Sequence, residues 1–145
     1  MIPDGRVVGL DLGSKRIGIA VTDSAQKVAT GVATLVRGQT HGEDHRAIAG
    51  VIEDYGAVGV VVGVPVSLSG LVGAAATAVL EEVEELRSVL DVVVETVDER
   101  LTTVAAAGAL RAAGRNVREQ RNLIDQAAAA ELLQTWVERR KAVSR

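Results

Sequence analysis

Three acidic positions could do chemistry because of where they lie. Asp11 interrupts the otherwise apolar run Arg6–Leu12 near its carboxyl end, and Asp98 and Glu99 follow the apolar run Asp91–Val97. Burying a carboxylate without a partner is costly, so an acid in such a place needs a reason. A structural reason exists for each: Asp11 opens a turn, and the pair forms a solvated charge cluster at a strand end. The apolar pattern does not decide which acid of the pair faces inward.

The third acid, Asp125, lies on the apolar side of a helix. At 100° per residue it falls within about 60° of an apolar stripe formed by Ala128, Ala129, Leu132 and Trp136. This position directs the carboxylate toward the core rather than toward water. The alternative is a capping role, in which Asn122 begins the helix and Asp125 occupies its third position.

Together these acids predict a metal centre. Carboxylates that meet at one edge of a sheet repel one another, and their pKa values rise unless a cation neutralises them. Magnesium and manganese suit a site made only of oxygen ligands. Two such ions about 4 Å apart activate a water and stabilise the leaving oxygen in phosphodiester hydrolysis. The acids therefore favour a two-metal phosphodiesterase.

Basic residues follow the acids. Residues 81–99 carry a net charge of −7 and residues 100–145 one of +5, although the whole chain carries −3. The side chains expected to hold a nucleic-acid backbone are Lys15, Arg16, Arg100, Arg111, Arg115, Arg118 and Arg121. For each of them a merely solvated position is the alternative. Tyr55 and Trp136 are the only aromatic residues, so base stacking cannot be a major mode of binding.

The elements that must position these residues fit one domain of 145 residues, with a basic, fraying tail at 139–145. The expected strands are Arg6–Leu12, Arg16–Thr22, a segment within Val28–Val36, Val58–Val64 and Asp91–Val97. The expected helices are His41–Tyr55, Ala74–Leu90, Thr102–Ala113 and Leu123–Glu138, with Gly114–Arg121 as a basic loop. Ala74–Leu90 carries a Glu-rich outer face formed by Glu81, Glu82, Glu84 and Glu85. This order predicts a mixed α/β sheet, antiparallel over its first three strands and parallel over its last two.

Composition excludes several classes. The chain has no Cys and two His, which excludes thiolate zinc sites, thiol nucleophiles, and metalloprotease-type or three-histidine metal centres. No stretch approaches about 20 apolar residues, and no basic segment followed by an apolar one begins the chain. We expect a cytoplasmic protein with no membrane partner.

Four segments carry a resemblance to a known family. They are Gly9–Asp23 (GLDLGSKRIGIAVTD), Val61–Pro65 with Gly70, Val97–Thr103 (VDERLTT) and Ile124–Ala128 (IDQAA). In this order and spacing the chain resembles the YqgF/RuvX family of bacterial nuclease-like proteins over nearly its whole length. The Val97–Thr103 segment is the most specific of the four. Val66–Ser69 departs from relatives, which often carry Asn and Asp there.

The resemblance implies a ribonuclease-H-like fold with five strands in the order 3-2-1-4-5, flanked by helices. It also implies a metal-dependent nuclease site at Asp11, Glu99 and Asp125, with Asp98 as the alternative to Glu99. The implied function is processing of the 5′ end of precursor 16S rRNA in ribosome biogenesis, with ribosome precursors as partners.

The alternatives are three other functions. A Holliday junction resolvase would act on branched DNA and would need a homodimer rather than a monomer. A non-catalytic rRNA-binding assembly factor would have no reason to keep acids that face the core. A sugar kinase or actin-like ATPase is disfavoured, since such enzymes need two lobes and this chain has room for one.

Overall fold

The computed structural model describes residues 1–65, 73–99 and 117–144. Its strands are β1 (Val7–Leu12), β2 (Arg16–Thr22), β3 (Ala29–Val36), β4 (Gly59–Val64) and β5 (Val93–Asp98). Its helices are α1 (His41–Tyr55), α2 (Ala74–Val89) and α4 (Val117–Ser144). With the exception of α4, each described element starts and ends within two residues of the predicted positions.

The strands form one mixed sheet in the order β3-β2-β1-β4-β5. β1 pairs antiparallel with β2, and β2 pairs antiparallel with β3. β4 lies parallel to β1 on one side and to β5 on the other. The predicted sheet is therefore confirmed. Because β1, β4 and β5 run in the same direction, their carboxyl ends meet at one edge, near Asp11 at the end of β1 and Glu99 after β5.

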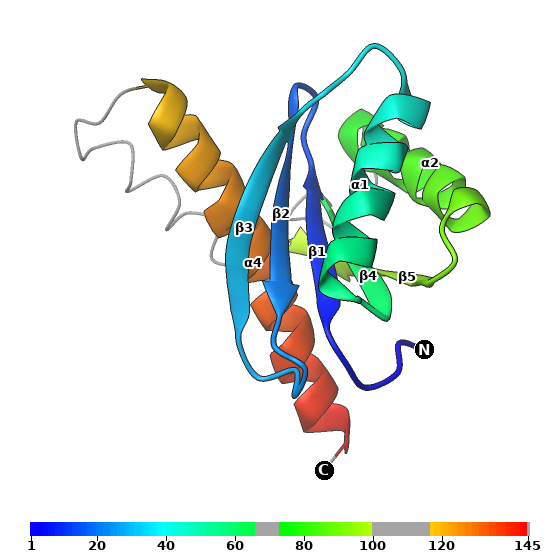
Figure 1. Ribbon diagram of the computed structural model, residues 1–145, viewed down its shortest axis with the longest axis vertical. Helices are drawn as coiled ribbons and strands as arrows, with labels where there is room; N and C mark the ends of the chain where they lie inside the picture. The colour runs from blue at the N-terminus through cyan, green and yellow to red at the C-terminus, as the bar shows by residue number, and fades with distance from the viewer. Residues whose placement is uncertain (66–72, 100–116, 145) are drawn as a thin grey trace.

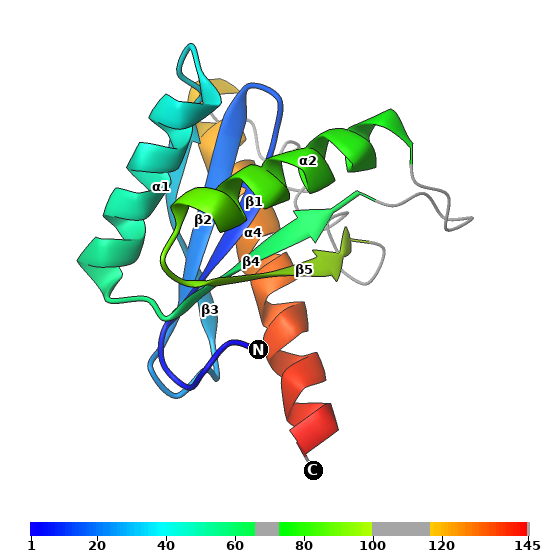
Figure 2. The same ribbon diagram turned by 90° about the vertical axis from the view of Figure 1, so that its right-hand side faces the viewer.

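Helices cover both faces of the sheet. α1 and α2 lie on one face, and α4 crosses the other (Figures 1 and 2). β4 belongs to both cores: Val60 and Val62 pack toward α1 and α2, whereas Val61 packs toward α4. A strand buried on both faces needs apolar side chains at every position, which explains the unbroken valine-rich run.

The outer face of α2 differs from the prediction at one residue. Glu81, Glu84 and Glu85 are exposed, but Glu82 retains 3% of its accessible surface. Its carboxylate turns inward toward Arg37, which follows β3. The positive charge of Arg37, more than forty positions away in the sequence, compensates for the burial of the Glu82 carboxylate. The sequence around Glu82 therefore does not indicate that this residue is buried.

α4 is much longer than predicted. It begins at Val117 rather than Leu123 and continues to Ser144, so the expected loop is helical in its last five residues and the expected tail is helical as far as Ser144. The segments at both ends lack glycine and proline, and good helix formers predominate in them, so nothing stops the helix. Asn122 consequently lies inside α4, and the capping alternative for Asp125 is wrong.

Several predictions lie outside the described residues. They are the helix Thr102–Ala113, most of the loop that follows Pro65, and the side chains of Arg100, Arg111, Arg115 and Arg118. Arg118 lies in the first turn of α4. Over the part of the chain that the structure describes, no helix is both long and apolar enough to cross a lipid bilayer.

Candidate active site at the carboxyl edge of the parallel strands

A glycine brings Asp11 and Asp125 together. Asp11 on β1 is paired with Gly18 on β2, so the two residues face the same side of the sheet. A Cβ atom at Gly18 would lie 2.0 Å from the main-chain oxygen of Asp125, which means that α4 fills the space of the missing side chain. Asp125 therefore lies near Asp11 on the α4 face, where its negative charge acts on the Asp11 carboxyl.

The structure also separates Glu99 from Asp98. Val97 packs in the core beneath α4, while Val64, the partner of Asp98 in the sheet, packs in the opposite core. Glu99 continues on the side of Val97, and its side chain is hydrogen-bonded with Asp11. Gly63 leaves the space that Glu99 fills, because a Cβ atom there would lie 2.8 Å from Glu99 Oε1. The negative charge of Asp98 also raises the pKa of Glu99.

Burial and mutual repulsion shift both carboxyl groups. Desolvation, followed by the charge of Asp125, raises the pKa of Asp11 above its usual range. Desolvation, the charge of Asp11 and their shared hydrogen bond raise the pKa of Glu99 to about 7. Their side chains share a hydrogen bond, and such a bond between two carboxyl groups requires one of the two to be protonated. Two acids that share one proton near neutrality form a site that lacks positive charge.

Arg16 holds the third carboxylate. Its Nε atom donates to Asp125 Oδ2 across 2.7 Å, and the two side chains keep 26% and 18% of their accessible surface. The three acids do not bring one oxygen each to within 4.8 Å of one another; among the described residues, His41, His45 and Glu82 alone meet that condition. An ion bound by all three acids would therefore require their carboxylates to move closer together.

The donor set suits magnesium or manganese. It consists of carboxylate oxygens, which these hard ions prefer, and no sulfur or imidazole joins it among the described residues. The raised pKa values of Asp11 and Glu99 show independently that the site favours added positive charge. The residues present therefore fit a divalent cation.

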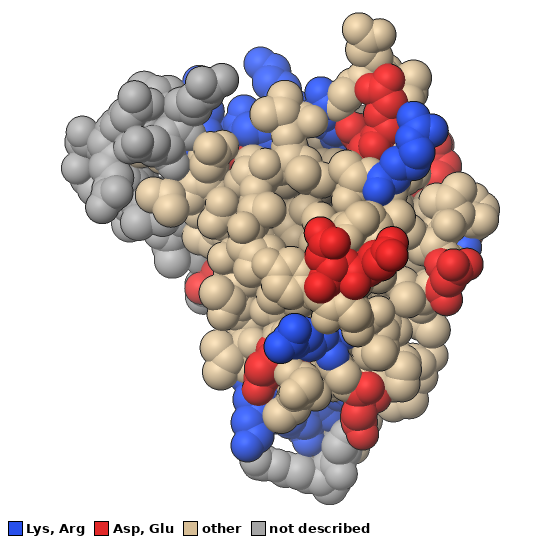
Figure 3. All heavy atoms as spheres, in the orientation of Figure 1, with Lys and Arg blue, Asp and Glu red and all other residues tan. Residues whose placement is uncertain are grey.

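The predicted basic residues that can be placed surround this edge. Lys15 is exposed in the turn between β1 and β2, next to Arg16, and Arg121 is exposed on α4 one turn before Asp125. In the view of Figure 3, basic side chains lie at the upper end and again in the lower part of the molecule. Acidic side chains occupy the middle of the same view.

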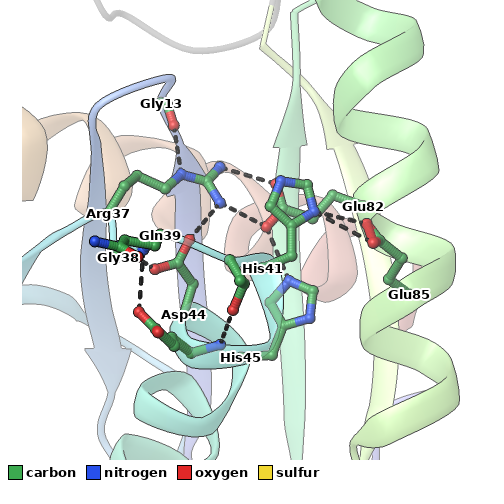
Figure 4. A network of polar contacts seen from close by, with 11 residues as sticks. Gly13, Arg37, Gly38, Gln39, His41, Asp44, His45, Glu82 and Glu85 are labelled. Carbon is green, nitrogen blue, oxygen red and sulfur yellow. Dashed lines mark hydrogen bonds and ion pairs between the residues drawn. The ribbon is translucent and has the colours of Figure 1, made fainter.

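One polar cluster was missed by the sequence reading. Arg37 donates to both oxygens of Glu82 at 2.7 and 2.8 Å, to Asp44 at 3.1 Å and to the carbonyl oxygen of Gly13 at 2.9 Å (Figure 4). These residues line a cavity of about 470 Å³ that reaches Leu12, at the end of β1. The cavity lies on the α1 and α2 side of the sheet. No local signal marks the cluster, since its members come from separate segments.

Comparison with known proteins decides the family. The model of the RuvX family, described as Holliday junction resolvase, matches residues 5–139. The chain belongs to the RuvX family.

Curated relatives agree with this membership. A protein of Nocardia farcinica is 46% identical over 147 residues, which cover 97% of this RuvX-family chain and 82% of the relative. A protein of Anaeromyxobacter dehalogenans is 44% identical over 135 residues, with coverage of 93% and 98%. Both are named "Putative pre-16S rRNA nuclease".

A solved structure shares the RuvX-family fold described here. It is T. thermophilus RuvC in complex with a Holliday junction substrate, with a TM-score of 0.52 and 20% sequence identity. The match covers 94% of this chain and 96% of RuvC. The common architecture is the ribonuclease-H-like fold, which confirms the expected fold class.

Proposed function

We propose that this chain is a divalent-metal-dependent nuclease that processes the 5′ end of precursor 16S rRNA. The observation that carries the proposal is the meeting of Asp11 and Glu99, two hydrogen-bonded acids with raised pKa values, beside Asp125. A purely structural role would not favour acids that destabilise one another. The names of the relatives supply the substrate.

The position of each acid gives it a different role in the proposed reaction. Asp11 lies at the centre, within the influence of both other carboxyl groups, and would be a ligand of every ion held there. Asp125 would bind from the side of α4 after releasing Arg16, whose guanidinium then becomes available to a phosphate oxygen. Glu99, with a pKa of about 7, would bind metal or orient and deprotonate the attacking water. When bound, the ions supply an activated water and a stabilised leaving oxygen.

Substrate binding would rest on the phosphate backbone. Lys15, Arg16 and Arg121 lie near the site, and we propose that Arg100, Arg115 and Arg118 contribute as well. Because Tyr55 and Trp136 are the only aromatic residues of the chain, bases cannot be read by stacking on an aromatic series. We therefore expect recognition of shape, on ribosome precursors in the cytoplasm.

The test compares Asp11→Asn with the wild type on a precursor 16S rRNA fragment, with magnesium and separately with manganese. We expect the cleavage rate to fall by at least about 10²-fold, because a charged ligand becomes neutral. Asp54→Asn, the same change at an exposed position of α1, is the matched control and should cleave like the wild type. Cleavage by Asp11→Asn at the wild-type rate would refute the proposed site.

Stability separates a lost ligand from a lost fold. The Asp11 carboxyl is disfavoured in the folded chain, as its raised pKa shows. Asp11→Asn removes that repulsion and should leave the free energy of unfolding in urea unchanged or higher. An inactive variant that is also markedly less stable would contradict this account of the site.

A second substrate is favoured by the description of the family model, which names Holliday junction resolvases. A resolvase cuts two symmetric strands and would need a homodimer. The same variants assayed on a four-way DNA junction, with the mass in solution measured by light scattering, distinguish the two substrates. Junction cleavage by a dimer, without cleavage of the rRNA fragment, would replace the proposed substrate.

A further inference from the structure

A second cluster of metal-ligating side chains lies on the opposite face of the sheet from the three acids. His41 and His45 are one turn apart on α1, and Glu82 faces them from α2 (Figure 4). His45 and Glu82 keep 5% and 3% of their accessible surface, whereas the side chain of His41 keeps 52%. The cluster is therefore closed on the protein side and open to solvent at His41.

The ligand atoms of these three residues are already close together. One donor atom from each lies within 4.8 Å of the others, and His45 Nε2 is 2.9 Å from Glu82 Oε2. Ligands around a tetrahedral zinc ion, at about 2.0–2.1 Å from the metal, lie roughly 3.3 Å apart. We propose that His41, His45 and Glu82 form a binding site for a transition-metal ion of the zinc class, which joins α1 to α2.

The charges around the cluster fit a divalent cation. Glu82 faces Arg37 and His45, and Asp44 also faces Arg37. Glu85 lies 2.9 Å from His41 Nδ1. With both imidazoles neutral, three carboxylates face a single guanidinium, so the cluster has an excess of two negative charges. An ion of charge +2 balances this excess.

Arg37 orients the Glu82 carboxylate and still leaves it able to bind a metal ion. The guanidinium grips both carboxylate oxygens, which fixes the orientation of the group. Each carboxylate oxygen has a second lone pair, and that of Oε2 accepts from His45 Nε2. A metal ion would take the place of the proton between these two atoms. Glu85, at the open side, supplies a carboxylate beside His41, as ligating histidines commonly have.

The ligand type separates this site from the three acids. Two imidazoles and one carboxylate suit zinc, cobalt or nickel, whereas magnesium prefers oxygen ligands alone. The inference does not rest on the proposed nuclease activity, because it concerns other residues and another class of ion.

The test is a titration of the chelator-treated full chain with Co²⁺, followed by its visible absorption, and then displacement of Co²⁺ by Zn²⁺. We expect one equivalent with the intense absorption of four-coordinate cobalt. His41→Gln, at the exposed ligand, should weaken binding by more than about tenfold, the smallest loss that even an outer partner of a ligating histidine causes. Circular dichroism verifies that this variant is folded.

Two controls locate the ion. Glu81→Gln changes an exposed carboxylate beside Glu82 and should leave Co²⁺ binding unchanged. Asp11→Asn impairs the proposed nuclease site and should also leave it unchanged. The inference is overturned if the wild type gives no four-coordinate absorption, if His41→Gln binds like the wild type, or if Asp11→Asn abolishes binding.

Discussion

Gly18→Ala tests whether the position of α4 sets the geometry of the acids. Gly18 lies on β2 opposite Asp11, and a Cβ atom there would be 2.0 Å from the main-chain oxygen of Asp125. Non-bonded carbon and oxygen atoms do not approach within 3.0 Å in this way. The obstacle is backbone rather than the end of a flexible side chain, so the helix must move away by roughly 1 Å.

The size of the effect follows from this displacement. Overpacking of this kind costs about 1–3 kcal/mol, and the upper end applies because Leu132 and Leu133 hold α4 in the core. For a chain of this length such a loss lowers the melting temperature by roughly 5–10 °C. The same movement carries Asp125 away from Asp11, and a misplacement of about 1 Å in a catalytic site can reduce the rate by about 10²-fold.

Two measurements check the prediction. Urea denaturation gives the free energy of unfolding, and cleavage of the precursor rRNA fragment is assayed at a temperature where Gly18→Ala remains folded. Gly50→Ala is the matched control: it lies in α1, a Cβ atom there meets nothing within 4 Å, and the exchange should stabilise the helix by about 0.5–1 kcal/mol without affecting cleavage.

The outcomes that refute the reasoning differ in meaning. Wild-type stability of Gly18→Ala would show that α4 does not lie against β2 as described. A loss of stability with wild-type cleavage would show that the position of Asp125 does not matter for the reaction.

Three further predictions concern charges. Arg37→Leu leaves Glu82 and Asp44 buried without their cation and should cost about 3–5 kcal/mol in urea unfolding; a loss below 1 kcal/mol would mean that the carboxylates are solvated. Two backbone amides that donate to Asp23 hold the pKa of that carboxyl below its ordinary 3.8. The stability of the wild type relative to Asp23→Asn should therefore be present above pH 3.8 and disappear as the pH falls through the lower folded-state value, which urea unfolding across pH measures. Arg16→Met frees a carboxylate on α4 and should tighten Mn²⁺ binding in calorimetry; weaker binding would contradict the assigned ion pair.

Local sequence patterns were sufficient where burial follows from neighbours along the chain. The valine-rich run of β4 predicts a buried strand, and the spacing of Asp125 with Leu132 predicts a helix whose apolar side faces the core. Both features are confirmed. The strand order itself came from the resemblance, because pairing between distant strands leaves little trace in either strand.

Local sequence patterns gave no correct prediction where the burial or orientation of a residue depends on a partner far away in the sequence. Glu82 lies among exposed glutamates, and its sequence context does not differ from theirs. It is nevertheless buried, because it pairs with Arg37, which is 45 positions away, and with His45, which is 37 positions away. Asp98 and Glu99 could not be separated because both faces of β5 carry apolar residues; the choice depends on which face α4 covers. Asn122 resembles a helix start, but a capping residue permits a boundary and does not impose one.

Glycines that bind nothing nevertheless determine the site. At Gly9, Gly18 and Gly31, on three adjacent strands, a Cβ atom would lie 2.8, 2.0 and 2.8 Å from atoms of α4. The helix can cross these strands at close range only because side chains are absent along its path. Its approach places Asp125 near Asp11, and a larger residue at any crossing would push the helix outward together with its acid. These glycines of the sheet therefore set the geometry that brings the carboxylates together. A search for charged or polar residues would not identify them.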